Sequence, residues 1–205
     1  TGTCPGWTSV EMMAEATHLA LADAGLMLDQ VDGVFAATAV HSMAAMSLRG
    51  NLGIEPKFSS GSNIGGSSFM SHVIAAAMAL EAGEIEVALI AYGSNQRSAG
   101  GFQTVSEPMP WEAVYQPRSP INAYAMAAAR YMHDFGCDRI PLAEVAVSAR
   151  SWAEHNPEAM MRDPLMVDEV LAARMISDPL GKLDCCLVTD GAAAMIMTRA
   201  DRAKD

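Results

Sequence analysis

The first clear pattern in the chain is a helical one over residues 10–24. Apolar side chains recur there at the spacing of one face of a helix. Thr8 and Glu11 stand at the spacing of a capping box, and Gly25 follows the last periodic residue. The pattern therefore predicts an amphipathic helix that covers a larger apolar surface.

Two later segments are apolar on all sides. Residues 69–82 are nearly all apolar or small, which predicts a helix buried over most of its circumference. Residues 87–91 form an uninterrupted apolar run, which is typical of a central parallel strand covered on both faces. A glycine-rich turn at residues 61–66 precedes the helix, and Ser67 and Ser68 are placed to cap it. Turn, helix and strand together form half of a βαβ unit.

The rest of the chain alternates strands and helices. Residues 31–39 and 192–198 have the character of strands, whereas residues 98–119 show little periodicity and several Gly and Pro residues, which indicates a loop. Helices are expected over four further segments: 42–52, 120–135, 141–155 and 167–175. We therefore predict an α/β fold with a mixed, mostly parallel sheet in which the strands at 87–91 and 192–198 are both central.

Composition narrows the class of protein. The chain has 205 residues, 51% of them hydrophobic, which is enough for one domain or one domain with an added lobe. Its net charge of −11 opposes binding to nucleic acid or to anionic membranes, so neither is expected as a partner. No apolar run approaches a membrane span, and no signal peptide is recognisable, so a cytoplasmic location is expected.

The four cysteines lack metal-ligand spacing and are expected to be reduced core thiols, with Cys185 and Cys186 on opposite faces of a strand.

Two segments resemble the thiolase superfamily. Thiolases open a buried helix with Asn-x-x-Cys and small residues, continue through Ala-Gly and an acidic residue, and reach a strand that ends in glycine. The chain has Asn63, then Ala-Gly-Glu at residues 82–84, then Gly93 at the end of the strand. Residues 184–194, DCCLVTDGAAA, resemble the last strand pair of a thiolase N-terminal half, in the branch of the sterol-carrier-protein thiolases. In this frame Gly66 occupies the position of the catalytic cysteine.

The resemblance implies a layered thiolase-like fold with a buried helix and a helical loop insertion. It divides the chain into a first part of the N-terminal half at residues 1–97, an inserted loop and helical region at 98–183, and a final strand segment at 184–205. By the same resemblance the sequence lacks the first strand of a thiolase and the C-terminal half, which supplies a histidine and a second cysteine. The chain is therefore expected to be the N-terminal half of a thiolase-like protein.

The resemblance also implies that a carbon–carbon bond is made or broken on acyl-CoA, the substrate, without a cofactor. Thiolases form an acyl-cysteine, and Gly66 removes that route, so a retro-aldol reaction is favoured over acyltransferase chemistry. Thiolase-like aldolases that lack the cysteine work with a small OB-fold partner that binds acyl-CoA. Thiolases also dimerise, and a homodimer is expected here through the strand at residues 89–93. The open alternative is a non-catalytic subunit that binds acyl-CoA or acts as a scaffold.

Each candidate catalytic residue also has a purely structural interpretation. Gly66 either lines the floor of an active site or is only the turn glycine of a helix cap. Ser67 and Ser68 fit helix caps better than nucleophiles, because no histidine with a carboxylate partner is spaced to activate them. His41, in the loop after a predicted strand, is the more plausible site histidine, whereas His72 in the buried helix fits a satisfied core histidine.

Four further residues have a possible role in binding or proton transfer. Tyr92 closes a buried strand and is assigned to packing, although a phenol there could donate a proton. Arg97, Arg118 and Arg130 are either ordinary surface charges or part of a cationic patch for a nucleotide phosphate, since so acidic a chain offers few cations. The turn at residues 61–66 does not match GxGxxG, so dinucleotide binding of the Rossmann type is disfavoured.

Overall fold

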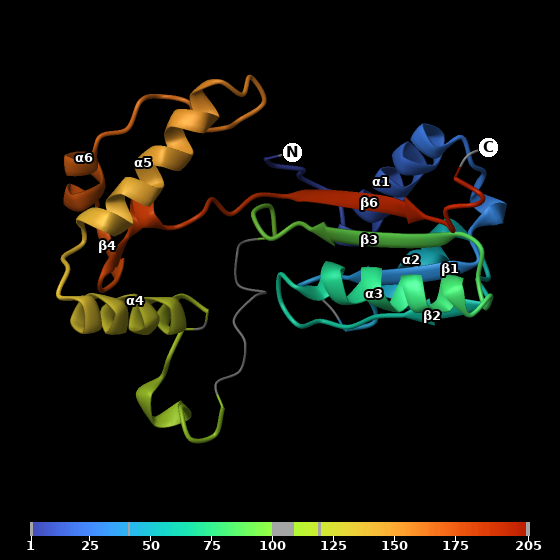
Figure 1. Cartoon of the computed structure of the whole chain (residues 1–205), viewed down its shortest axis with the longest axis horizontal. Helices are drawn as coiled ribbons and strands as arrows, with labels where there is room; N and C mark the ends of the chain where they lie inside the picture. The colour runs from blue at the N-terminus through green and yellow to red at the C-terminus, as the bar shows by residue number, and fades with distance from the viewer. Residues whose placement is uncertain (1, 41, 100–108, 119, 204–205) are drawn as a thin grey trace. The chain divides into compact units, whose positions relative to one another are not determined.

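The computed structural model describes residues 2–40, 42–99, 109–118 and 120–203. The chain forms two compact units, each described by itself below (Figure 1). Unit 1 comprises Thr1–Thr104 and Val188–Asp205, and unit 2 comprises Val105–Leu187. No helix among the described residues is both long enough and apolar enough to cross a membrane.

Unit 1 is built on a four-stranded sheet in the order β2-β1-β3-β6 (Figure 1). β1 (Gly33–Ala37), β2 (Phe58–Ser60) and β3 (Ala88–Ser94) are parallel, and β6 (Gly191–Met197) runs antiparallel beside β3. The predicted α/β fold with a mixed, mostly parallel sheet is confirmed, and so is the central position of β3. The prediction that β6 is also central is wrong, because β6 is the last strand of the sheet and β3 is its one partner among the described strands.

Helices cover both faces of this sheet. α1 (Ser9–Ala24) and α2 (Ala44–Leu52) pack on one face, in a core that includes Leu89 of β3. α3 (Ser68–Glu81) packs on the opposite face, in a second core that includes Ile90. Successive side chains of β3 thus enter different cores, as the twofold periodicity of a strand requires, and this explains why its sequence is apolar throughout.

α1 begins and ends where the sequence predicts. The Thr8 backbone N–H donates to the Glu11 carboxylate at 2.8 Å, and the Glu11 backbone N–H donates to Thr8 Oγ1 at 3.2 Å, so the capping box is confirmed. Gly25 closes the helix in the left-handed region, with a φ of 66°.

α3 buries only one of its faces. Ala76 and Leu80 are buried against the sheet, whereas Met70, Ile74 and Met78 are 67%, 62% and 66% exposed. The prediction of a helix buried over most of its circumference is therefore wrong for the described part of the chain. The small and apolar composition of α3 suits two packed faces, and the described residues cover one of them.

β3 cannot be the dimer interface in the way that the sequence suggested. Both of its edges carry hydrogen-bonded neighbours, β1 on one side and β6 on the other. A second copy of the chain would need a strand with an unpaired edge. Among the described strands of this sheet, β2 and β6 have one.

β3 and α1 approach each other closely at Gly93, which gives a first prediction. A Cβ on Gly93 would lie 2.7 Å from Met13 Cγ and would also overlap the Ser9 carbonyl oxygen. Because the second atom belongs to the backbone, the helix itself would have to shift. We expect Gly93→Ala to lower the free energy of unfolding by about 1–3 kcal/mol, as overpacking typically does, when measured by urea denaturation.

The matched control for this variant is Gly50→Ala. Gly50 lies within α2, and a Cβ there meets no heavy atom within 4 Å. Alanine favours a helix over glycine, so this control should be as stable as the wild type or more stable. Equal unfolding midpoints for the two alanine variants would contradict the close approach at Gly93.

Unit 2 is mainly helical. Its helices are α4 (Ile121–Phe135), α5 (Ile140–Glu154) and α6 (Val167–Ala172). A small antiparallel pair follows, formed by β4 (Met175–Ser177) and β5 (Leu180–Gly181). The three helices are confirmed to within a few residues of their predicted ends, whereas the strand pair was not predicted. Short 3-10 turns occur in the two units at Leu28–Gln30, Ala113–Tyr115 and Lys182–Asp184.

The cysteines differ from the prediction in their placement. All four are free, which agrees with the expected reduced thiols. Cys185 follows the turn Lys182–Asp184, and Cys186 is exposed, so neither of them lies in a strand. Cys4 and Cys137 are half-buried, so the assignment of the thiols to the core is wrong.

Candidate functional site

The candidate site lies where the parallel strands of unit 1 end. The chain leaves the sheet at its carboxyl edge after β1, β2 and β3, and α3 begins directly after the turn at residues 61–67. In open α/β sheets ligands bind beyond the carboxyl ends of the strands, where loops vary without disturbing the core. The segment that resembles the thiolase nucleophile turn therefore stands at the edge that favours a binding site.

Hydrogen bonds fix the shape of this turn. Ser68 Oγ donates to the Gly65 carbonyl at 2.7 Å and accepts from the Ile64 backbone N–H at 3.0 Å. Asn63 Nδ2 donates to the Thr38 carbonyl at 3.3 Å, which ties the turn to the end of β1. Gly65 has a φ of 77°, a left-handed conformation that glycine adopts without strain. The left-handed conformation at position 65 therefore explains why the turn has glycine there.

Gly66 is exposed and has room for a side chain. A Cβ on Gly66 would meet no heavy atom within 4 Å, and its backbone lies outside the left-handed region. Neither crowding nor backbone conformation therefore explains why glycine stands at the position of the thiolase cysteine. The consequence of the glycine is that this position has no nucleophilic side chain.

Ser67 and Ser68 do not cap α3 through their side chains, as the sequence predicted. Ser67 is the N-cap residue by position, but its exposed hydroxyl makes no capping hydrogen bond. Ser68 is buried, and its hydroxyl is engaged within the turn. The first turn of α3 also carries no acidic residue, so its backbone N–H groups and the positive end of the helix dipole face the turn without a side-chain counter-charge.

His72 is buried in α3 directly beneath the turn. Its Nε2 accepts a hydrogen bond from the Ser62 backbone N–H at 3.1 Å, and the Ser62 hydroxyl lies at the same distance. Burial lowers the pKa of His72, because the charged ring is disfavoured there. The core placement of His72 is confirmed, but its hydrogen bonding is incomplete, because Nδ1 is buried and finds no partner in the described part of the chain.

The other aromatic and basic candidates are placed as follows. Tyr92 is half-buried and packs edge-to-face on Phe69 of α3, with ring centroids 5.0 Å apart, which agrees with a packing role. Arg97 is exposed in unit 1 and donates through Nη1 to the Val188 carbonyl at 3.2 Å. Arg118 is exposed in unit 2. His41 lies outside the described residues.

Asp190 is a buried anion at this edge of the sheet, and its role is not predictable from the residues beside it. Its carboxylate accepts hydrogen bonds from the backbone N–H groups of Cys4 at 2.8 Å, Arg97 at 2.9 Å and Ser98 at 3.1 Å, and from the Ser98 hydroxyl. Burial raises the pKa of Asp190, but these hydrogen bonds outweigh it and lower the pKa to about 2. Asp190 thus joins the N-terminal segment, the segment after β3 and the start of β6.

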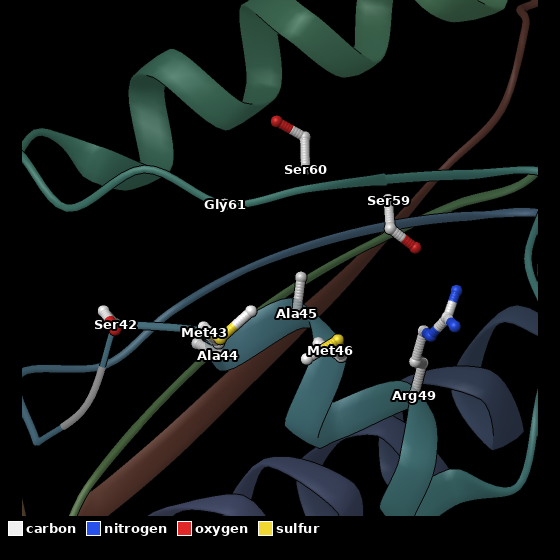
Figure 2. Close-up of a pocket in the computed structure, with 9 residues that line it drawn as sticks. All are labelled: Ser42, Met43, Ala44, Ala45, Met46, Arg49, Ser59, Ser60 and Gly61. Atoms are coloured by element: carbon white, nitrogen blue, oxygen red, sulfur yellow. The ribbon is translucent and has the colours of Figure 1, made fainter.

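A pocket of about 330 Å³ lies beside the start of the turn, between α2 and β2 (Figure 2). Figure 2 shows the Arg49 side chain extending from α2 toward Ser59 of β2. Arg49 makes no ion pair with a described residue, and Met43 and Met46 supply apolar lining. Sequence reasoning missed this pocket because β2 is too short and polar to be recognised as a strand. Among the described side chains, no group of three His, Cys, Asp or Glu residues is placed to hold a metal ion.

Comparisons with known proteins give three informative relatives, although no protein-family model matches the chain. The steroid side-chain-cleaving aldolase of Thermomonospora curvata is 34% identical over 98% of this chain and 54% of its own length. The 17-hydroxy-3-oxo-4-pregnene-20-carboxyl-CoA lyase of Mycobacterium tuberculosis is 33% identical over 98% of this chain and 55% of its own length. The solved structure of the Ltp2-ChsH2(DUF35) aldolase has a TM-score of 0.82 and 32% identity over 98% of this chain and 53% of that chain.

The chain therefore spans about half the length of these relatives. The likeness extends over almost all of the present chain, and so includes both segments that resemble thiolases. Sequence motif, sheet topology and relatives point to the same family. The chain belongs to the thiolase superfamily and matches a thiolase-like N-terminal half, and its homologues include sterol-carrier-protein-thiolase-like proteins and aldolases.

Proposed function

We propose that the protein cleaves a carbon–carbon bond of a β-hydroxyacyl-CoA by a retro-aldol reaction. The observation that carries this proposal is Gly66, which leaves the thiolase cysteine position open and without a nucleophile. A Claisen reaction through an acyl-cysteine has no nucleophile in this turn, whereas a retro-aldol reaction needs none. The names of two relatives, an aldolase and a CoA lyase, support the same class of reaction.

The reaction has two demands on the protein. A base must take the proton of the β-hydroxyl, after which the bond between the α- and β-carbons breaks to give a carbonyl compound and the enolate of the shorter acyl-CoA. Donors must then stabilise the enolate oxygen until the α-carbon is protonated. The N-terminus of α3 supplies backbone N–H donors and a positive dipole end with no acidic residue in its first turn.

We assign the remaining roles on the same basis. His41, which follows β1 in the sequence, is the candidate base of this half of the protein. Arg97 and Arg118, both exposed, are candidate contacts for the phosphates of CoA. Gly66 and Ser67, both exposed, form the surface against which the thioester lies, and the buried Ser68 supports that surface from within the turn. The relatives' names favour a steroid with a CoA-linked side chain as the substrate class.

Partners follow from the same relatives. The name of the Ltp2-ChsH2(DUF35) aldolase joins two components, which supports a partner protein for this chain as well. The resemblance to thiolase-like aldolases without the cysteine favours a small OB-fold partner that binds acyl-CoA. Self-association is assigned to the outer edge of β2, because the strand first expected to mediate it has both edges paired. β2 is exposed at Phe58 and Ser59, as a strand that meets another chain would be.

The test is a retro-aldol assay on the full-length protein with 17-hydroxy-3-oxo-4-pregnene-20-carboxyl-CoA. We expect a 17-keto steroid and propanoyl-CoA, since the bond between C17 and C20 breaks. Mass spectrometry of the same mixture should show no acyl adduct on residues 61–72. An adduct there would exclude the non-covalent route. Binding of CoA without either adduct or cleavage would instead support a non-catalytic acyl-CoA-binding or scaffold subunit.

Restoring a thiol to the turn gives a prediction of its own. Gly66→Cys should fold like the wild type because a Cβ has open space there, and its exposed thiol should react with iodoacetamide. We expect this variant to acquire an acyl adduct from acyl-CoA without gaining cleavage rate, as measured by mass spectrometry and product formation. Gly66→Ser is the matched control that adds a side chain of similar size without a thiol. An adduct on the control as well would show that the thiol at this position is not what reacts.

A further inference from the structure

His72 makes a contact that fixes its protonation state. Its Nε2 lies 3.1 Å from the Ser62 backbone nitrogen, in hydrogen-bond geometry. A backbone N–H can only donate, so Nε2 must be the unprotonated acceptor and the neutral ring carries its proton on Nδ1. A histidine charged on both nitrogens, or protonated on Nε2 alone, could not hold Ser62 in this way.

The arrangement has a cost that core packing alone does not explain. His72 is 2% exposed, and Nδ1 has no hydrogen-bond partner among the residues that the structure describes. An unsatisfied buried donor opposes folding, and a leucine of similar volume would avoid it. The ring lies near Phe35, with centroids 6.4 Å apart, so an apolar side chain would suit the surroundings. The contact that distinguishes histidine from leucine here is the one with Ser62.

From Ser62 a chain of hydrogen bonds reaches both sides of the turn. The Ser62 hydroxyl has two neighbours at 3.1 Å, His72 Nε2 and Ser71 Oγ, and one proton to share between them. Ser71 Oγ donates to the Ser68 carbonyl at 2.7 Å, and Ser68 Oγ bonds the Gly65 carbonyl and the Ile64 N–H. His72 therefore holds the turn at Ser62, near its beginning. The hydroxyls of Ser71 and Ser68 extend the hydrogen bonds to Ile64 and Gly65, near its end.

We propose that His72 is a positioning residue: as the neutral Nδ1–H tautomer it holds Ser62 and thereby sets the turn at residues 61–67 for binding the thioester of an acyl-CoA. The identity of the ligand rests on the proposed function, whereas the positioning of the turn does not. His72 does not itself touch the ligand, since its ring is buried beneath the turn.

The tautomer is tested on the unmodified full-length protein by nitrogen-15 NMR of the histidine rings. We expect His72 to show a protonated Nδ1 and an unprotonated Nε2. A protonated Nε2 would overturn the proposal outright, because the acceptor for Ser62 would not exist. This readout needs neither a variant nor a ligand.

The positioning role is tested with three variants of His72. His72→Gln can place an oxygen where Nε2 was, whereas His72→Asn reaches only the Nδ1 position, and His72→Leu offers no acceptor. We expect the Ser62 amide to exchange with solvent at least tenfold faster in the Asn and Leu variants, and the dissociation constant for 17-hydroxy-3-oxo-4-pregnene-20-carboxyl-CoA to rise at least tenfold. His72→Gln should stay close to the wild type. His18→Gln, at an exposed site on α1, is the control that should change neither readout.

The outcomes separate this proposal from the proposed function. If the wild type does not bind the CoA ester, the function fails, while the tautomer and the Ser62 exchange rate still decide whether His72 positions the turn. If the Leu variant does not fold, the Asn and Gln pair carries the comparison, because both are polar and differ in reach. Wild-type exchange at Ser62 in both the Asn and Leu variants would overturn the positioning role.

Discussion

Replacing Asp190 by alanine is expected to unfold unit 1 under conditions in which the wild-type protein is folded. The carboxylate is fully buried and accepts from Cys4, Arg97 and Ser98, residues that are 92 to 186 positions away in the sequence. Without it, backbone N–H groups of two segments would lose a fully buried acceptor at once, and the start of β6 would lose its tie to both segments. Urea denaturation followed by circular dichroism measures the loss.

Two controls separate the carboxylate from simple loss of a charge. Asp29→Ala removes an exposed carboxylate from the turn Leu28–Gln30 and should leave the unfolding midpoint close to that of the wild type. Asp190→Asn keeps the shape and one acceptor oxygen but turns an NH₂ group toward donors, so its stability should fall between wild type and Asp190→Ala. Wild-type stability of Asp190→Ala would mean that the segments are held by other contacts.

The same residue should control stability in acid. The pKa of Asp190 is lowered from its ordinary value of 3.8 to about 2, because hydrogen bonds to the ionised form outweigh the effect of burial. The folded protein therefore binds this proton less readily than the unfolded chain does. The stabilisation is complete above pH 3.8 and is lost as the pH falls toward 2.

Unfolding free energies measured across this acid range test the assignment. The pKa values of Glu11, Asp32 and Asp134 are also lowered, so the wild type alone cannot separate Asp190 from these carboxylates. The difference between wild type and Asp190→Asn should shrink as the pH falls from 3.8 toward 2, because the amide has no proton to bind. A difference that stays constant over this range would show that Asp190 is not the titrating group.

Much of unit 1 could be predicted because its elements are specified locally. α1 combines helical periodicity with the Thr8 and Glu11 capping box, and both of its ends were found. β3 is covered on both faces, so its sequence is continuously apolar. In both cases, residues within a few positions of each other carry the whole signal.

Sheet order could not be predicted in the same way because it depends on partners far apart in the chain. β6 is apolar and its sequence resembles that of a central strand, yet it lies at an edge. β2 is an exposed three-residue strand whose sequence, Phe-Ser-Ser, has no pattern to detect. An apolar sequence indicates that a strand is buried under other elements, but it does not indicate which strands pair with that strand in the sheet.

In the candidate site, too, local features could be predicted from the sequence, whereas contacts between distant segments could not. The Asn63 to Gly66 motif is local and could be recognised from the sequence, whereas its place at the carboxyl edge depends on β2, which was not predicted. The roles of Asp190 and His72 depend on donors that other segments bring to them, including the Ser62 N–H for the histidine. For Asp190 the available signal was an acidic residue next to an apolar strand, which indicates a buried charge in need of partners.

Unit 2 depends on a buried ion pair, and breaking it should have the second large effect. Arg139 donates to the Asp184 carboxylate at 3.1 Å, with side chains 18% and 5% exposed, and the Gly181 N–H donates to the same carboxylate oxygen at 2.6 Å. Arg139 also donates to the Leu171 carbonyl at 3.3 Å, so the pair links α5, the end of α6 and the turn Lys182–Asp184. Among the described residues of this unit, the fully buried apolar side chains are Ala125, Ala143 and Val170, a small core.

We expect Arg139→Met to lower the free energy of unfolding of unit 2 by about 3–5 kcal/mol, because it leaves a buried carboxylate without its cation. Hydrogen exchange in peptides from α5 and α6 reports this unit separately from unit 1. The double variant Arg139→Met with Asp184→Leu should recover most of the loss, since an apolar pair carries no uncompensated charge. The control is Arg130→Met, which breaks an exposed pair with Asp134 on α4 and should cost less than about 0.5 kcal/mol. If the double variant were as unstable as the single one, the ion pair itself would be what holds α5 to α6, and packing could not replace it.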